Sequence, residues 1–86
     1  MNDLITRASQ LFAVSAASLR GPRRLRAVVE ARQAVMWAAW RDGYTLVSIG
    51  RALGKRDHST IAHGVKRAER LATTDAEYAR CLAALL

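Results

Sequence analysis

Residues 54–67 read GKRDHSTIAHGVKR, a turn followed by the start of a helix. Gly54 tolerates the left-handed backbone conformation that ends helices, so it closes the segment before it. Asp57 is a good N-cap, because its carboxylate accepts hydrogen bonds from the first turn and suits the positive end of the helix dipole. The stretch therefore predicts a helix that is capped by Asp57 and runs to about residue 71.

The two faces of this predicted helix differ in chemistry. At about 100° per residue, one arc gathers apolar side chains. They are Ile61, Val65, Ala68 and Ala72. The opposite arc carries Ser59, His63, Lys66 and Arg70. His58 and Ser59 project forward from the first turn, so the helix is suited to enter a DNA major groove with its N-terminal end. An ordinary amphipathic helix with a solvated basic face would show the same pattern.

The composition fits one small helical domain that prefers polyanions. The chain has 86 residues, of which 51% are hydrophobic, which is enough for one domain with a real core. Strand-like alternation is scarce, so the core should be helical. Fourteen lysines and arginines stand against seven acidic residues, giving a net charge of +7. This charge favours nucleic acid as a partner, and an acidic membrane surface second.

Secreted and membrane proteins fit the sequence poorly. The single cysteine, Cys81, excludes an internal disulfide and is expected to be a small core residue in a reducing compartment. No apolar run approaches the ~18 residues of a membrane span. Asp3 and Arg7 interrupt what would otherwise resemble a signal peptide. We therefore expect a cytoplasmic, nucleoid-associated protein with no membrane partner.

The motifs of catalysis and metal binding are incomplete. A phosphate-loop-like stretch at residues 50–56 is one residue short and follows no strand. Asp57, His58 and Ser59 are adjacent, so their side chains point in different directions and cannot form a relay. His58 and His63 are five residues apart, whereas two ligands on one helix face need a spacing of four. We expect no enzyme activity, no catalytic residue, no cofactor and no metal site.

Capping residues and helix breakers divide the N-terminal part of the chain. The first helix is capped by Asn2 or Asp3 and ends at Val14. Its apolar stripe is Leu4, Ile5, Ala8, Leu11 and Phe12. A short helical turn capped by Ser15 follows, and the Gly21-Pro22 pair then breaks the chain. A long helix starts in the basic segment after this break.

A helix-turn-helix is predicted at about residues 45–71. The long helix runs to about Asp42, and Thr45 caps a short helix over residues 46–53. A tight turn then leads to the helix capped by Asp57, which completes the motif. Thr73 or Thr74 is expected to cap a last helix. Its stripe is Tyr78, Cys81, Leu82, Leu85 and Leu86. The predicted fold class is all-α, a small helical bundle that forms one domain over residues 1–86.

A second basic cluster precedes the long helix. It consists of Arg20, Arg23, Arg24 and Arg26. A loop arginine can enter a minor groove while a recognition helix occupies the adjacent major groove. One basic cluster is usually a solvated surface, but two beside a helix-turn-helix favour DNA.

Arg32 lies in the middle of the apolar arc of the long helix. A cation there is costly unless its head finds a partner or escapes to the surface. It could pair with a carboxylate across the core, or lie along the core edge and reach a phosphate. The residues alone leave both alternatives open.

Residues 54–63 resemble the signature of a known family. The stretch Gly54-x-Arg56-Asp57-His58-Ser59-Thr60-Ile61-x-His63 is similar to G-x-R-D-H-[ST]-T-[VI]-x-H, from the C-terminal DNA-binding domain (domain IV) of the bacterial replication initiator DnaA. The upstream Arg23-Arg24-x-Arg26 and Arg32-Gln33 are similar to its basic loop and long helix. The resemblance covers about Leu4 to Leu71. It implies a Trp-repressor-like all-α fold that binds double-stranded DNA, at a DnaA-box-like site, as a monomer.

The resemblance also implies roles for individual residues. Base edges in the major groove would be contacted by Asp57, His58 and Ser59, and Arg24 would enter the minor groove. Phosphates would be held by Arg26, Arg32, Gln33, Thr60 and His63, which moves Arg32 to the phosphate alternative. The remaining residues expected to contact the DNA backbone are Arg23, Lys55, Arg56, Lys66 and Arg67.

The ATPase and self-association modules of the initiator do not accompany this stretch, which starts at its own Met1. We therefore expect a free-standing DNA binder that regulates replication initiation or transcription, in possible competition with the full-length initiator. The sequence leaves open whether the stretch is instead the DNA-reading domain of a longer initiator. The alternative is a protein-interaction module whose basic face docks an acidic partner, such as an initiator or a polymerase subunit.

Overall fold

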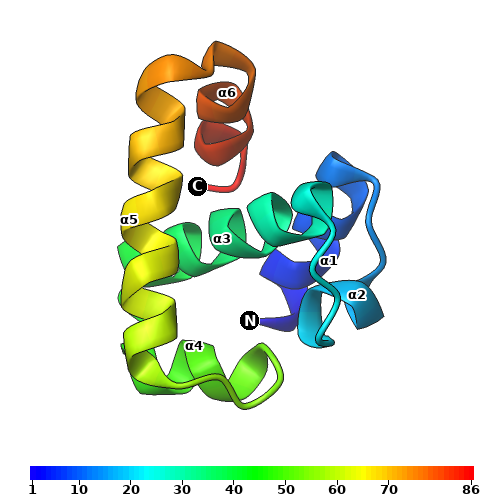
Figure 1. Cartoon of the computed structure of the whole chain (residues 1–86), viewed down its shortest axis with the longest axis vertical. Coiled ribbons are helices and arrows are strands. Elements are labelled where there is room, and N and C mark those ends of the chain that lie inside the picture. The colour runs from blue at the N-terminus through cyan, green and yellow to red at the C-terminus, as the bar shows by residue number, and fades with distance from the viewer.

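The computed structural model describes all 86 residues and contains six helices and no strand, as the sequence predicted (Figure 1). The helices are α1 (Asn2–Phe12), α2 (Ala16–Arg20), α3 (Arg26–Arg41), α4 (Leu46–Ala52), α5 (His58–Thr74) and α6 (Ala76–Ala84). Helices α4 and α5, joined by a short turn, form the predicted helix-turn-helix. None of the helices is both long and apolar enough to span a bilayer.

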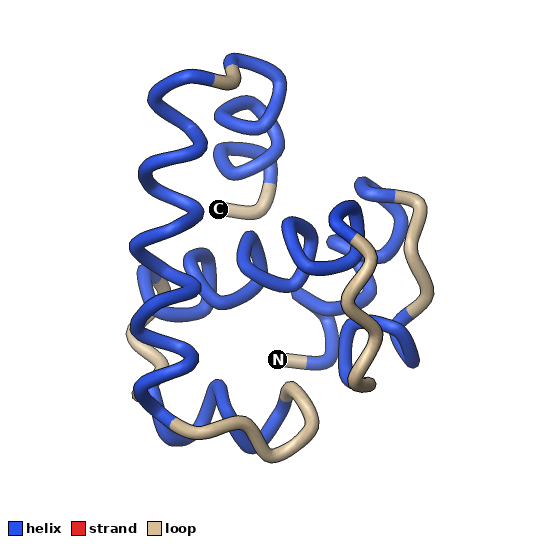
Figure 2. Tube along the Cα trace, viewed as in Figure 1, coloured by secondary structure: helices blue, strands red, loops and turns tan.

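Helix α3 is the central element, and the others pack around it. Figure 2 shows α5 running past one end of α3. Helix α4 lies below α3, and α6 folds back beside the C-terminal half of α5. Helices α1 and α2 lie at the other end of α3, joined to it by the basic loop, residues 21–25. The basic loop and the N-terminal end of α5 are 33 or more residues apart in sequence, yet Arg56, in the turn before α5, donates to the carbonyl of Gly21 at the start of the loop.

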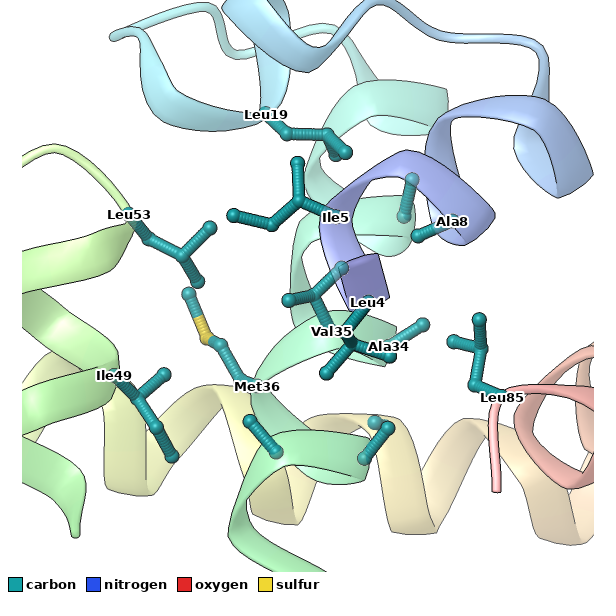
Figure 3. Close-up of a cluster of buried hydrophobic side chains, with 14 of the residues drawn as sticks. Leu4, Ile5, Ala8, Leu19, Ala34, Val35, Met36, Ile49, Leu53 and Leu85 are labelled. Atoms are coloured by element: carbon teal, nitrogen blue, oxygen red, sulfur yellow. The ribbon is translucent and has the colours of Figure 1, made fainter. Parts of the chain in front are cut away.

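The core is one cluster of apolar side chains around α3. Small residues such as Ala34 and Ala39 on α3 are fully buried and allow the neighbouring helices to approach closely. Figure 3 shows Ile5 of α1, Leu19 of α2 and Leu53 at the end of α4 converging on this helix. Burying each such leucine or isoleucine stabilises the fold by roughly 1.5–3 kcal/mol. The core therefore fixes the relative positions of α2, α3 and α4.

Three predicted caps are confirmed. The side-chain oxygens of Ser15 and Thr45 accept hydrogen bonds from the third residue that follows each of them, at 3.0 and 3.1 Å. The Asp57 carboxylate accepts from the Ser59 backbone N–H at 3.0 Å. Each cap satisfies a backbone donor that the first turn of its helix leaves free.

The predicted boundaries of α1 and α5 are wrong. Met1 occupies the N-cap position of α1, and neither Asn2 nor Asp3 caps it. Ala13, in the left-handed conformation with φ 55°, ends α1 at Phe12 rather than at Val14. Helix α5 continues beyond residue 71 to Thr74.

The last helix begins one or two residues later than predicted. Asp75 caps α6 by accepting from the Tyr78 N–H at 3.0 Å, so the expected caps at Thr73 and Thr74 are wrong. The two threonine hydroxyls instead donate back to the carbonyls of Arg70 and Leu71, as threonines inside a helix do.

Two leucines predicted for the core are exposed, Leu11 by 43% and Leu86 by 67%. Leu11 lies in the last turn of α1 and Leu86 is the chain terminus, so neighbouring helices cover neither side chain. Cys81 is half-buried, and burial raises the pKa of its thiol. The apolar stripes therefore overstate the burial of these two side chains, whereas Leu53 and Leu85, also at helix ends, are buried as predicted.

Candidate nucleic-acid interface

The turn between α4 and α5 depends on two glycines. Gly54 has φ 84°, a left-handed conformation that strains residues with a side chain. Gly50 lies under the turn, and a Cβ there would overlap the carbonyl oxygen of Arg56. The Arg56 N–H donates to the Gly50 carbonyl at 2.9 Å. The turn therefore packs directly on the backbone of α4, which fixes the direction in which α5 starts.

The first turn of α5 presents polar side chains to solvent. Asp57 accepts hydrogen bonds from both the N–H and the hydroxyl of Ser59. The His58 Nδ1 lies 3.6 Å from the other carboxylate oxygen, and its side chain is 65% exposed. Because Asp57 holds Ser59 and lies beside His58, the three residues predicted to contact bases in the major groove form one cluster at the N-terminal end of α5.

The stability contributed by the Asp57 cap is expected to depend on pH. The hydrogen bonds from the Ser59 side chain and backbone lower the pKa of Asp57 from its ordinary value of 3.8. A pKa depressed in the folded state means that the stabilisation is complete above this ordinary value, and is lost as the pH falls through the folded-state pKa.

Asp57→Asn tests this expectation, because asparagine caps helices about as well but does not titrate. We expect wild type to melt at a higher temperature than Asp57→Asn at neutral pH, with the difference shrinking below pH 3.8. Thermal melts followed by circular dichroism across this range measure the difference. A gap that stays constant with pH would contradict a stabilising role for the charge.

Arg32 is buried, with 5% of its surface exposed, and bonds to backbone carbonyls rather than to a carboxylate. Its Nε donates to the carbonyl of Leu19 at 2.8 Å. Its Nη2 lies 2.8–3.0 Å from the carbonyl oxygens of Ser18, Gly21 and Arg23. The carboxylate alternative is therefore wrong, because Arg32 donates hydrogen bonds to carbonyls at the end of α2 and in the basic loop. Burial, with the charges of Arg56 and Arg24, lowers its pKa.

Phosphate contact by Arg32 stays a prediction, and the geometry restricts it to one atom. Nε and Nη2 are both occupied by carbonyls, whereas Nη1 has no protein partner. Every buried side-chain nitrogen in the chain has a partner, so Nη1 must reach the surface.

An arginine-lined hollow of about 460 Å³ lies between the basic loop and α5. The arginines that line it are Arg20, Arg24, Arg32 and Arg56. Thr60 and Gly64 of α5 and Gln33 of α3 complete its walls, and no acidic residue lines it. None of the four arginines forms an ion pair. Several arginines without an acidic partner form a site that suits a phosphate group.

A second group of residues predicted to contact DNA forms hydrogen bonds and ion pairs within the protein. Arg67 donates to the Gln33 side-chain oxygen at 3.2 Å and lies 4.0 Å from Glu30. Arg26 donates to the same Glu30 carboxylate at 3.2 Å. Glu30 therefore offsets part of the charge of both arginines. Contacts from Arg26, Gln33 and Arg67 to a DNA backbone stay predictions.

Apart from Arg56, whose guanidinium donates to carbonyls of the protein, the remaining predicted contacts are exposed and free. They are Arg23, Arg24, Lys55, Thr60, His63 and Lys66. Arg20 belongs to the predicted basic cluster but not to the predicted DNA contacts, although it lines the hollow and donates to the side chain of Asn2 at 3.0 Å. The only feature of the sequence that could have indicated this role for Arg20 is its place directly before the Gly21-Pro22 break.

Comparison with known proteins places this arrangement in a family. The sequence model described as "Bacterial dnaA protein helix-turn-helix" matches residues 1–68. The chain is 45% identical over 67 residues to the chromosomal replication initiator protein DnaA of Thermomicrobium roseum, a match covering 77% of the chain and 14% of the relative. The corresponding protein of Ruegeria pomeroyi is 35% identical over 80 residues, or 92% of the chain and 17% of the relative.

These relatives are much longer than the chain, which spans less than a fifth of their length. The matched residues nevertheless include the basic loop, α3, α4 and α5 as far as residue 68. The chain belongs to the family of the bacterial DnaA helix-turn-helix domain.

Proposed function

We propose that this protein binds double-stranded DNA in a sequence-specific manner, with α5 in the major groove and the basic loop at the adjacent minor groove. The observation that carries the proposal is that Thr60 and Gly64 of α5 line the same hollow as Arg24 of the basic loop, and that no acidic residue there offsets the positive charge of its arginines. Two elements that face one anionic hollow can engage one duplex together. Membership of the DnaA helix-turn-helix family supports the same function.

In this proposal, the exposed first turn of α5 contacts bases. Asp57, His58 and Ser59 read base edges, and Arg24 enters the minor groove. The phosphates are held by Arg23, Lys55, Thr60, His63, Lys66 and the free Nη1 of Arg32. The expected target is a DnaA-box-like site, bound by a monomer. At such sites the protein would regulate replication initiation or transcription, in competition with a full-length initiator.

Selection of bound sites from a pool of random duplexes tests the proposal directly. We expect enrichment of a DnaA-box-like sequence over several rounds. Enrichment of an unrelated site would keep DNA binding but overturn the assigned target. No enrichment, together with salt-resistant binding to an acidic protein, would favour the interaction module instead.

The salt dependence of affinity is expected to be steep. If about six phosphates are neutralised, the logarithm of the association constant should fall with that of the salt concentration at a slope near −5. Fluorescence anisotropy with a labelled duplex at several salt concentrations measures this slope. A slope near zero would show that the basic residues do not contact phosphates.

Substitutions at two positions of α5 should separate base contacts from phosphate contacts. His58→Ala should weaken binding to the selected site by about 1–3 kcal/mol, with little effect on random duplex, because it removes a base contact. Lys66→Ala should weaken both duplexes alike and make the salt slope shallower by about 1. Both side chains are exposed, so each variant should fold as wild type does. An unchanged ratio of specific to random binding in His58→Ala would rule out its role in recognition.

A further inference from the structure

We propose that Arg56 is a positioning residue that sets the spacing between the two DNA-contacting elements, the basic loop and the first turn of α5. This inference rests on the proposed function. It replaces the expectation that Arg56 contacts a DNA phosphate.

The guanidinium of Arg56 joins parts of the chain that are far apart in sequence. Its Nη1 donates to the carbonyl of Leu53, at the end of α4, and lies 3.4 Å from the carbonyl oxygen of Arg20. Its Nη2 donates to the carbonyl of Gly21, where the basic loop begins. Arg20 and Gly21 precede Arg56 by 36 and 35 residues. One planar group therefore holds the turn before α5 against the start of the basic loop.

The acceptors at the loop are carbonyls that α2 cannot satisfy itself. The last carbonyls of a helix lack intrahelical partners, and an arginine is well suited to them because it carries several donors and a positive charge. Arg32 approaches the same region from α3 and also donates to the Gly21 carbonyl, at 3.0 Å. The start of the basic loop is thus held from two sides, by α3 through Arg32 and by the turn through Arg56.

The turn is in direct backbone contact with the end of α2, immediately before the basic loop. A Cβ on Gly54 would overlap the carbonyl oxygen of Arg20. No side chain can separate them there, so the Arg56 hydrogen bonds fix a close contact between the two backbones.

Arg24 connects this arrangement to DNA. Burial, together with the nearby charge of Arg24, lowers the pKa of Arg56. The same charge acts on Arg32. Two fixed guanidinium groups beside Arg24, with no acidic residue in the hollow, favour conformations in which Arg24 extends into solvent. Arg56 therefore helps to hold Arg24 where it can enter a minor groove while α5 occupies the major groove.

Arg56→Lys is the informative variant, because it keeps the charge but loses the planar fork that spans several carbonyls. Arg51→Lys is its matched control, since Arg51 is an exposed arginine of the neighbouring helix without a hydrogen-bond partner. Circular dichroism melts establish that each variant folds.

The first measurement needs no DNA. NMR order parameters of the backbone amides of Gly21, Arg23, Arg24 and Leu25 should fall in Arg56→Lys, remain unchanged in α6, and be unaffected throughout in Arg51→Lys. Unchanged order parameters in the basic loop would overturn the positioning role, whether or not the protein binds DNA. Failure of DNA binding with lowered order parameters would instead count against the proposed function alone.

The second measurement is a double-mutant cycle on the site recovered by selection. Arg24→Ala should weaken binding about 5- to 150-fold in the wild-type background, and less than about 2-fold in the Arg56→Lys background, because Arg24 is no longer held in place. The effect of His58→Ala should be the same in both backgrounds. If the Arg24 and Arg56 effects multiply instead, Arg56 acts independently of Arg24, and the proposal is wrong.

Discussion

Arg32→Met is expected to lower the free energy of unfolding by roughly 3–4 kcal/mol. Methionine retains an apolar stem of similar length, so the change removes four hydrogen bonds while largely preserving the packing. Each lost bond costs about 1 kcal/mol, and the carbonyls left without a donor lie partly out of reach of water. A domain of this size has only roughly 5–15 kcal/mol in total, so the variant should be marginally stable.

Urea denaturation followed by far-ultraviolet circular dichroism measures this loss. Arg51→Met is the control, because Arg51 is exposed and its replacement should change stability by less than about 0.5 kcal/mol. A loss below about 1 kcal/mol in Arg32→Met would mean that water replaces the guanidinium at the end of α2. Arg32 would then be explained better by contact with a phosphate than by its carbonyl bonds.

The role of Arg32 marks where prediction from the sequence reached its limit. A buried cation needs a partner, and the sequence suggests a carboxylate or a phosphate. It does not point to backbone carbonyls, because every residue has one and no sequence pattern marks those that a helix end leaves free. The acceptors for Arg32 precede it by 9 to 14 residues, and two of those for Arg56 by 35 and 36. Only the packing of α2, α3 and the turn brings these groups together.

Local signals were more reliable. Asp57 caps α5 as predicted, because a cap acts within one helical turn and only a few residue types form one well. The same reasoning failed at residues 73–75, where three capping residues stand in succession. The hydroxyls of the two threonines bond within α5, which leaves Asp75 as the cap of α6. Sequence can identify a cap more readily than it can choose among adjacent ones.

The sequence identifies the basic loop and the first turn of α5 as two distinct basic elements, but it does not predict the distance between them in space. This distance depends on the contact between the turn and the end of α2, which Gly54 makes possible. The signature that suggested the family contains Gly54 and Arg56 beside the residues assigned to bases. In the structure, Gly54 lets the turn approach the carbonyl of Arg20, and the Arg56 guanidinium donates to the carbonyl of Gly21.

Gly54→Ala should therefore destabilise the protein more than the same change at another left-handed glycine. Gly43 and Gly54 have φ angles of 97° and 84°, so alanine costs each of them roughly 1–2 kcal/mol of backbone strain. Gly43 has open space around it, whereas a Cβ on Gly54 would overlap the Arg20 carbonyl. This overlap should cost about 1–3 kcal/mol more, because neither backbone can move without disturbing its neighbours.

Comparison of the two variants by urea denaturation isolates the contact between turn and loop from the strain of the φ angle. Equal losses would mean that the turn can move away from the loop at little cost. The Arg56 hydrogen bonds would then be too weak to fix the distance between the two elements. A larger loss at Gly54, accompanied by a weakened effect of Arg24→Ala on DNA affinity, would show that one backbone contact both stabilises the fold and sets the geometry with which it meets DNA.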